Sequence, residues 1–147
     1  MRGVQILAAV TLLAAGACSP SDAPAPLPTE ESIVGDYQLT LVNGGHLPFP
    51  VAGDTTRLLA ITDGQLVIHA DHTFLDVLST RLTYFSGTPV PSTHSDTATG
   101  TFALVGSLII RTHLDVVADT VLGIDTVAVT GNLMHANNGG LLLTYQK

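Results

Sequence analysis

The sequence predicts an all-β fold, an antiparallel up-and-down β-barrel of about eight strands, with a β-sandwich as the alternative. Three observations support this prediction. From residue 33 onward, short runs rich in Val, Ile, Leu and Thr alternate apolar and polar positions. Gly, Asn, Asp and Pro interrupt these runs about every 8 to 12 residues, as turns do in β proteins. The same region contains no sustained helical repeat with capping residues at its ends.

The first predicted strand is 36–42, in which alternate residues share one face. A turn at Asn43-Gly44-Gly45 follows, and 46–50 predicts a loop because its two prolines lack the backbone donor of a strand. Gly-containing turns are expected at Asp63-Gly64, Val105-Gly106 and Gly123. The remaining predicted strands are 55–62, 65–69, 73–80 (with 81–85 as an extension or a separate strand), 100–104, 107–113, 115–122, 125–130, 132–135 and 141–146.

The first and last predicted strands should pair and close the barrel, because otherwise both would be left as open edges. The first strand directs Tyr37, Leu39 and Leu41 to one side. The last strand directs Leu141, Leu143 and Tyr145 to one side. Two apolar faces of similar length can line one core together.

The amino-terminal residues predict export. Arg2 precedes an apolar run from Val4 to Ala15, which is shorter than the about 20 residues needed to span a bilayer and suits a signal peptide. Ala15-Gly16-Ala17 then precede Cys18, the single cysteine. This order resembles the lipobox of bacterial lipoproteins, although Ala15 stands where that family prefers Leu. The resemblance implies removal of 1–17 and a lipid on Cys18; the alternative is an ordinary secretory signal with Cys18 as a free thiol.

Residues 18–32 predict a tether between the lipid and the domain 33–147. Four prolines lie between Ser19 and Ser32, and prolines disfavour helix and sheet and keep a chain extended. In the sorting rule of Gram-negative lipoproteins, Asp after the cysteine favours the inner membrane. Ser19 therefore implies the outer membrane, with the domain on its periplasmic face.

The charge balance excludes nucleic acid as a partner. Five Lys and Arg face twelve Asp and Glu, for a net charge of −7, whereas nucleic-acid binding needs clustered basic residues. The same balance disfavours adsorption of the domain to anionic lipid. Membrane attachment is therefore expected through Cys18.

Gly35-Asp36-Tyr37 resembles the Gly-x-Trp opening of lipocalins, with Tyr in place of Trp. The segments 43–48, 66–74, 100–102 and 145–147 are similar to segments of short lipocalin-like lipoproteins of bacteria. The resemblance implies a small barrel that binds a small apolar ligand, and a basic residue, Lys147 or Arg111, that covers Tyr37 beside Tyr145 at the closure. The rings that could line such a ligand, although a filled core is the favoured interpretation of them, are Phe74, Tyr84, Phe85 and Phe102.

Candidate metal ligands are better interpreted as solvated residues. His69 and His72 fall on opposite limbs of a predicted hairpin around Asp71, and the further donors His94 and Asp96 lie in a loop. A second set, which lacks the dense loop of a calcium site, comprises Asp115, Asp119 and Asp125. We expect no metal and no cofactor.

No enzymatic activity is expected, because the domain contains neither a Gly-x-Ser-x-Gly elbow nor a cysteine. Two functions remain open. One is an envelope lipoprotein that binds a small apolar ligand, which a cavity above about 300 Å³ would favour. The other is a structural or protein-interaction lipoprotein, which a filled interior and an apolar outer patch would favour.

Overall fold

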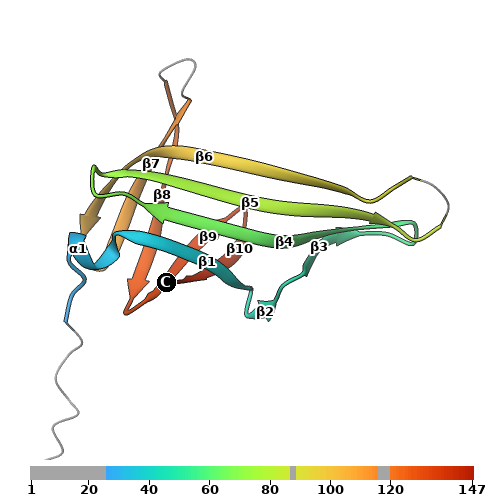
Figure 1. Ribbon diagram of the computed structural model, residues 1–147, viewed down its shortest axis with the longest axis horizontal. Helices are drawn as coiled ribbons and strands as arrows, with labels where there is room; N and C mark the ends of the chain where they lie inside the picture. The colour runs from blue at the N-terminus through green and yellow to red at the C-terminus, as the bar shows by residue number, and fades with distance from the viewer. Residues whose placement is uncertain (1–25, 87–88, 116–119) are drawn as a thin grey trace, which may run out of the picture.

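The computed structural model describes residues 26–86, 89–115 and 120–147, and it contains a closed antiparallel β-barrel (Figure 1). The predicted signal peptide, Cys18 and Ser19 lie outside the described residues. One short helix and ten strands follow in chain order: α1 Glu30–Ile33, β1 Gly35–Val42, β2 Gly45–His46, β3 Phe49–Gly53, β4 Arg57–Ile68, β5 Thr73–Tyr84, β6 Ser92–Val105, β7 Leu108–Asp115, β8 Thr120–Thr130, β9 Leu133–Asn138 and β10 Leu141–Gln146.

The barrel consists of β1 and β4 to β10, each antiparallel to its neighbours. Strand β1 closes it by pairing on both sides: Gly35 to Gln38 face β4, and Gln38 to Val42 face β10. Strands β2 and β3 are additions that pair with β1 and β4 respectively. The barrel and the pairing of the first strand with the last are therefore confirmed, and the sandwich is excluded.

A bulge in β1 changes which of its residues face the core. The pairing with β10 shifts between Leu39 and Leu41, and a bulge reverses the side to which later residues point. Tyr37, Leu39 and Val42 are buried, whereas Leu41 is only half-buried. The prediction of strict alternation through Leu41 is therefore wrong at that residue.

Several predicted breaks are also wrong. Strand β4 continues through Asp63-Gly64, where a bulge replaces the expected turn. Strand β8 continues through Gly123, and the register with β7 shifts beside it, where Leu122 of β8 is left without a paired residue. The expected loop 46–50 overlaps the end of β2 and the first two residues of the edge strand β3, which tolerates Pro50 because it pairs with β4 alone.

The expected tether ends in a helical turn. The Thr29 side chain caps α1 by accepting from the Ser32 amide, and the Thr29 amide donates to Ser32 Oγ at 2.9 Å. This reciprocal pair satisfies free amides of a helix start. Glu30 to Ser32 are therefore helical, contrary to the prediction of an extended segment. Ile33 is buried in the core, so this turn covers one end of the barrel.

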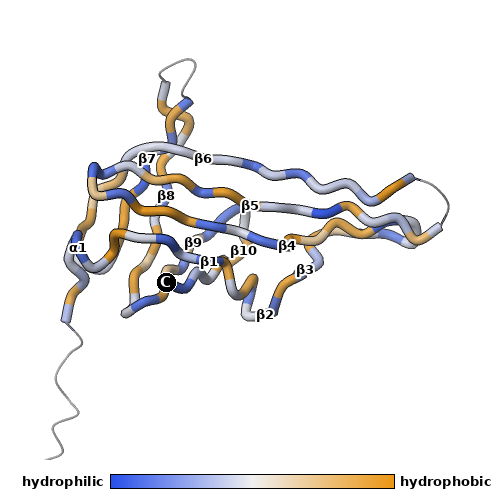
Figure 2. Tube along the Cα trace, in the orientation of Figure 1, coloured by the Kyte–Doolittle hydropathy of each residue, from blue (hydrophilic) through white to orange (hydrophobic). Residues whose placement is uncertain are grey.

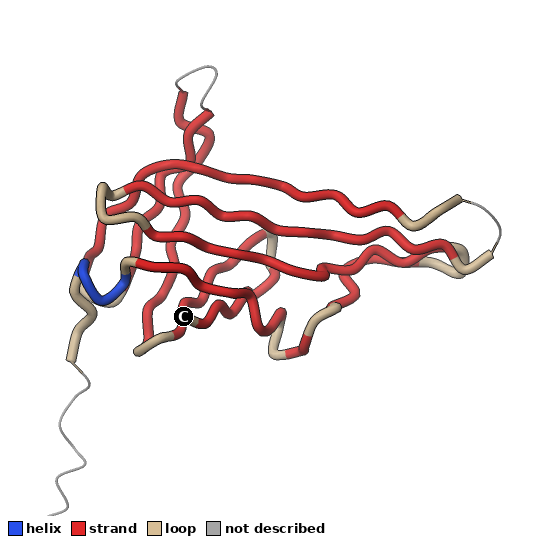
Figure 3. Tube along the Cα trace, viewed as in Figure 1, coloured by secondary structure: helices blue, strands red, loops and turns tan. Residues whose placement is uncertain are grey.

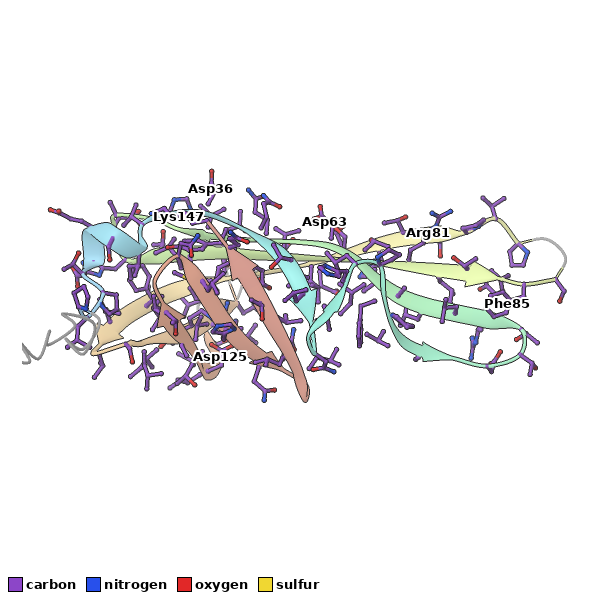
Figure 4. All side chains as sticks on the ribbon, turned by 90° about the horizontal axis from the view of Figure 1, so that it is seen from below. Asp36, Asp63, Arg81, Phe85, Asp125 and Lys147 are labelled. Carbon is purple, nitrogen blue, oxygen red and sulfur yellow. The ribbon has the colours of Figure 1, made fainter. Side chains whose placement is uncertain are left out.

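Strand β3 and the continuations of three barrel strands form a projecting sheet, which we call the arm. The three continuations are residues 57–62 of β4, 79–84 of β5 and 92–97 of β6. Figures 1 and 3 show these strands running side by side well beyond β9 and β10. In Figure 2, β6 is mostly pale or blue along the arm. Figure 4 shows Phe85 near the tip of the arm and Lys147 beside α1 at the opposite end.

Inward-facing side chains fill the barrel. Tyr37, Tyr145 and Phe74 are the largest of those that are fully buried, and they belong to one continuous apolar cluster with Met134 and Leu143. Every buried side-chain nitrogen or oxygen in the described part of the chain has a hydrogen-bond partner. Within those same residues, no helix is long and apolar enough to cross a bilayer.

Candidate binding site at the barrel mouth

An arginine lies inside the barrel. On β7, Ile109 and Arg111 are buried and alternate with more exposed residues, and His113, two positions further on, shares their face. Arg111 is only 2% exposed. A buried guanidinium is stable only when its donors are paired, so the surrounding acceptors define the site.

Two carboxylates hold this guanidinium. Asp125 of β8 accepts from Arg111 Nε at 2.8 Å and from Nη2 at 2.6 Å, the bidentate geometry that makes such pairs strong. Asp76 of β5 accepts from Nη1 at 2.7 Å. The network therefore joins three strands, with one positive charge between two negative ones.

Three rings complete the network. Tyr145 donates its hydroxyl to Asp76 at 3.1 Å, and His113 Nε2 lies 3.1 Å from Asp125 Oδ2. The Arg111 guanidinium carbon lies 5.1 Å from the centre of the Phe74 ring, within the range of a cation–π contact. Phe74 also packs edge-on against His113, so the polar network rests directly on the apolar core.

These contacts determine protonation. Burial opposes the charge of Asp125, but hydrogen bonds and the charge of Arg111 outweigh it and hold the pKa of Asp125 below 3.8. Burial disfavours the charge of Arg111 as well, yet both carboxylates keep its pKa raised. Burial and the neighbouring Asp76 raise the pKa of the Tyr145 hydroxyl. Asp125 and Arg111 are thus ionised and Tyr145 is neutral at neutral pH.

A cavity of about 530 Å³ opens onto this network at the end of the barrel opposite α1. Its lining includes Asp76, Arg111, His113 and Asp125 from the network. The rim is formed by Asp96 and Ala98 of β6, Leu78 of β5 and the β9–β10 turn from Asn137 to Gly139. The cavity lies above the filled core, at the mouth of the barrel.

The carboxylates at this mouth have unused acceptor capacity. A carboxylate offers about four lone-pair positions. Asp76 accepts one bond on each of its oxygens, from Arg111 and from Tyr145. With Asp96 and Asp125, the lining contains three carboxylates and one arginine. The mouth is therefore suited to a group that donates hydrogen bonds and has positive charge.

The four aromatic residues expected to line an apolar ligand are not brought together. Phe74 and Phe102 are buried in the core. Tyr84 is half-buried at the end of β5 in the arm, and Phe85 beyond it is 59% exposed. None of the four lines the mouth cavity.

The residues expected at the closure do meet. Tyr37 is buried and donates its hydroxyl to the Ile33 carbonyl at 2.9 Å. Lys147 Nζ lies 5.6 Å from the centre of the Tyr37 ring. Tyr145 pairs with Leu39 across the β1–β10 seam. The alternative cover for Tyr37, Arg111, lies over Phe74 instead.

No group of three or more potential metal ligands occurs among the residues that the structure describes. His72 lies 3.9 Å from Glu30, and His94 lies 3.0 Å from Asp96. The interpretation of Asp125 as a solvated residue is wrong, because it pairs with Arg111 inside the barrel. Asp119 lies outside the described residues.

The network of Arg111, Asp76 and His113 was not anticipated from the sequence, although a signal for it exists. Arg111 falls two residues after the apolar Ile109, and Asp76 two residues after Phe74. In a strand, that spacing places a charged residue on the inward face. Two opposite charges in inward positions of different strands indicate an internal ion pair.

Comparisons with protein-family models, with curated proteins and with solved structures find no match for this chain.

Proposed function

We propose that this chain is an envelope lipoprotein that binds a small cationic ligand, such as an amine, at the mouth of its barrel. The observation that supports it is the acidic lining of the 530 Å³ cavity around Asp76 and Asp125. A volume above about 300 Å³ suits a small molecule. The proposal keeps a binding function and the lipid on Cys18, and replaces the apolar ligand with a polar one.

The side chains of the site are already held in place without a ligand. Arg111 is fixed by bonds to both carboxylates, and Phe74 supports it from the core. A site whose groups are already oriented loses little conformational freedom on binding. An ammonium group near Asp76 would add a donor to its free lone pairs without displacing Arg111.

The direct test uses four-carbon probes that differ only in their end groups. Putrescine should bind in a calorimetric titration and shift the NMR signals of Asn137 and His113. The neutral 1,4-butanediol and the anionic succinate should not. Asp76→Asn should weaken putrescine binding about tenfold, which corresponds to about 1.4 kcal/mol. Equal binding of diol and diamine would refute the proposal.

A second variant tests the proposal even if Asp76→Asn fails to fold. Asn137→Asp adds a carboxylate at the rim and retains the oxygen that accepts from the Gly140 amide at 3.1 Å. It should tighten putrescine binding severalfold, since a nearby opposite charge gains about 1 kcal/mol in water. Asp36→Asn, on an exposed position of β1, serves as the control and should change nothing.

The anchor is tested separately. Cys18→Ala should release the protein from the membrane fraction or block removal of residues 1–17, because the acylated residue would be missing. Unchanged fractionation together with an unchanged processed mass, apart from the substitution itself, would show that Cys18 bears no lipid.

A protein-interaction lipoprotein remains the second candidate function. Three large apolar side chains on β8, Val121, Leu122 and Ile124, are 60%, 69% and 69% exposed. Exposed apolar clusters mark contact surfaces. This candidate predicts that Ile124→Ser leaves putrescine binding intact but abolishes capture of an envelope protein by in-membrane cross-linking.

A further inference from the structure

The outer edge of β6 in the arm is open for strand pairing. Between Ser92 and Thr99, β6 pairs with β5 on one side, and its pairing with β7 on the other side begins only at Gly100. No other strand pairs with this segment among the residues that the structure describes. The segment therefore offers a row of backbone donors and acceptors.

The register identifies which backbone groups face outward. The Phe102 amide donates to the His72 carbonyl at 2.8 Å, toward β5. Backbone direction alternates along an antiparallel strand, and the β5–β6 pairing has no register shift. The amides and carbonyls of Thr93, Ser95 and Thr97 therefore point away from β5.

The two edges of the arm differ in their protection. Strand β3, at the other edge, contains Pro50 and a bulge between Pro50 and Ala52, and both features discourage addition of another strand. The β6 edge from Ser92 to Thr99 contains no proline, no lysine and no bulge. A long, regular edge with no lysine and a single carboxylate, Asp96, is a site for strand addition.

We propose that a second copy of this chain occupies the edge, with β6 antiparallel to β6 about a two-fold axis at Ser95. Thr93, Ser95 and Thr97 would exchange backbone hydrogen bonds with Thr97, Ser95 and Thr93 of the second copy. Both arms would then form one continuous sheet, and the two barrels would lie at its opposite ends.

The side chains select this partner and this register. His94 of one copy would face Asp96 of the other on one side of the sheet, in a position where side chains lie close. Thr93 would face Thr97 on the other side, a favourable cross-strand pair. Centring the axis on Asp96 would instead oppose two aspartates, and centring it on His94 would leave Asp96 against Ser92.

A groove at the end of the edge fits the same arrangement. On the amino-terminal side of Gly100, β6 no longer pairs with β7. A groove of about 360 Å³ lies there, lined in part by Thr97, Leu114 and Leu122. In the proposed register, Val90 of the second copy falls opposite Gly100, next to this groove. Val90 is 81% and Leu122 69% exposed in the single chain, so the assembly would cover both.

Cysteine cross-linking in the full-length chain tests the axis. Two Ser95→Cys residues would have their Cα atoms about 5.5 Å apart, within the range of a disulfide, about 4.4 to 6.8 Å. Two Thr97→Cys residues would be displaced by four positions, about 14 Å along the strands. Mild oxidation should therefore link the first variant and not the second, while the parent chain, with Cys18 alone, provides the background.

A charge exchange tests the register. His94→Asp should weaken dimerisation about tenfold in sedimentation experiments at about 0.15 M salt, because like charges would face each other. The double variant His94→Asp with Asp96→His should recover the parent affinity. Both side chains are exposed, so neither change threatens the fold. Equal linking of both cysteine variants, no rescue by the double variant, or a parent chain that stays monomeric to about 100 μM would overturn the proposal.

Discussion

The barrel and the arm share β4, β5 and β6, yet the same strands behave differently in the two regions. In the barrel, their inward side chains are almost completely buried, with Leu66 at 0%, Phe74 at 2% and Phe102 at 7% exposure. In the arm, β5 from Ser79 to Tyr84 is half-buried or exposed throughout. Apart from the bulge between Ile61 and Asp63, β4 and β5 pair along both regions, so backbone hydrogen bonding alone does not distinguish them. Closure of the sheet on itself produces the core.

The barrel is therefore expected to supply most of the stability, and the arm to supply accessible edges. Burial of apolar area is the main favourable contribution to folding, and Ala60 and Ile61 are the buried apolar residues of the arm among those that the structure describes. Regions with few buried apolar contacts open locally at low cost. Amide hydrogen exchange should accordingly be faster in the arm than in the barrel half of the same strands.

The largest expected effect contrasts one tyrosine from each region. Tyr37→Ala should cost about 3 to 5 kcal/mol of unfolding free energy, because truncation of a buried aromatic leaves a cavity. It also removes the hydrogen bond to Ile33. Tyr84→Ala, in the half-buried arm, should cost only about 1 kcal/mol. Denaturant unfolding of both variants measures the difference, and equal losses would contradict the assignment of the core to the barrel.

The junction between the two regions should be the next most sensitive point. A Cβ atom at Gly100 would lie 1.9 Å from the Thr112 carbonyl oxygen, so the β6 and β7 backbones must move apart to accept any side chain. Gly100→Ala should therefore cost about 1 to 3 kcal/mol, as overpacking does.

Gly123→Ala is the matched control, since a Cβ atom there meets nothing within 4 Å. It should leave stability nearly unchanged in the same thermal and denaturant measurements. A tolerated Gly100→Ala would mean that β6 and β7 do not approach each other closely at this point.

The sequence predicts the barrel because closure depends on local alternation. Tyr37 and Leu39 of the first strand, and Leu143 and Tyr145 of the last, have the period of two that a sheet facing one core requires. That pattern survives in the structure. It fails at Leu41, because a bulge depends on the partner strand and leaves no mark in the alternation itself.

The arm and the mouth are harder to predict because they depend on distant residues. Gly64 and Gly123 have the composition of turns, yet both lie inside long strands. At Gly64 the reason is packing: a Cβ atom would lie 2.9 Å from Leu39 Cδ2. The pairing of Arg111 with Asp76 joins residues 35 positions apart, and nothing local to either residue identifies the other.

Acid should affect the barrel through Asp125. Its folded pKa lies below 3.8, so the unfolded chain binds its proton first as the pH falls. The contribution of Asp125 is fully present above the unfolded pKa and is lost as the pH falls through the folded pKa. Unfolding free energy should therefore decline below about pH 4 to 5.

Asp125→Asn should flatten this decline, whereas Asp36→Asn, the same charge change at an exposed site, should not. The slope of stability against pH is the quantity to compare, since Asp125→Asn also weakens the pairing of Arg111 and lowers stability at every pH. An unchanged slope would show that Asp125 titrates alike in the folded and unfolded chains.

The smallest expected effect concerns the seal of the barrel at its α1 end. Lys147 Nζ contacts the Tyr37 ring at 5.6 Å and donates to the Ser32 carbonyl at 3.0 Å. Lys147 is exposed, and a cation–π contact made by an exposed cation contributes about 0.5 to 1 kcal/mol. Lys147→Ala should therefore reduce the unfolding free energy by less than about 1 kcal/mol, well below the loss for Tyr37→Ala. Lys147→Met retains most of the apolar stem and separates the charge from the packing. A loss comparable to that of Tyr37→Ala would mean that the lysine, and not the buried ring, holds the closure together.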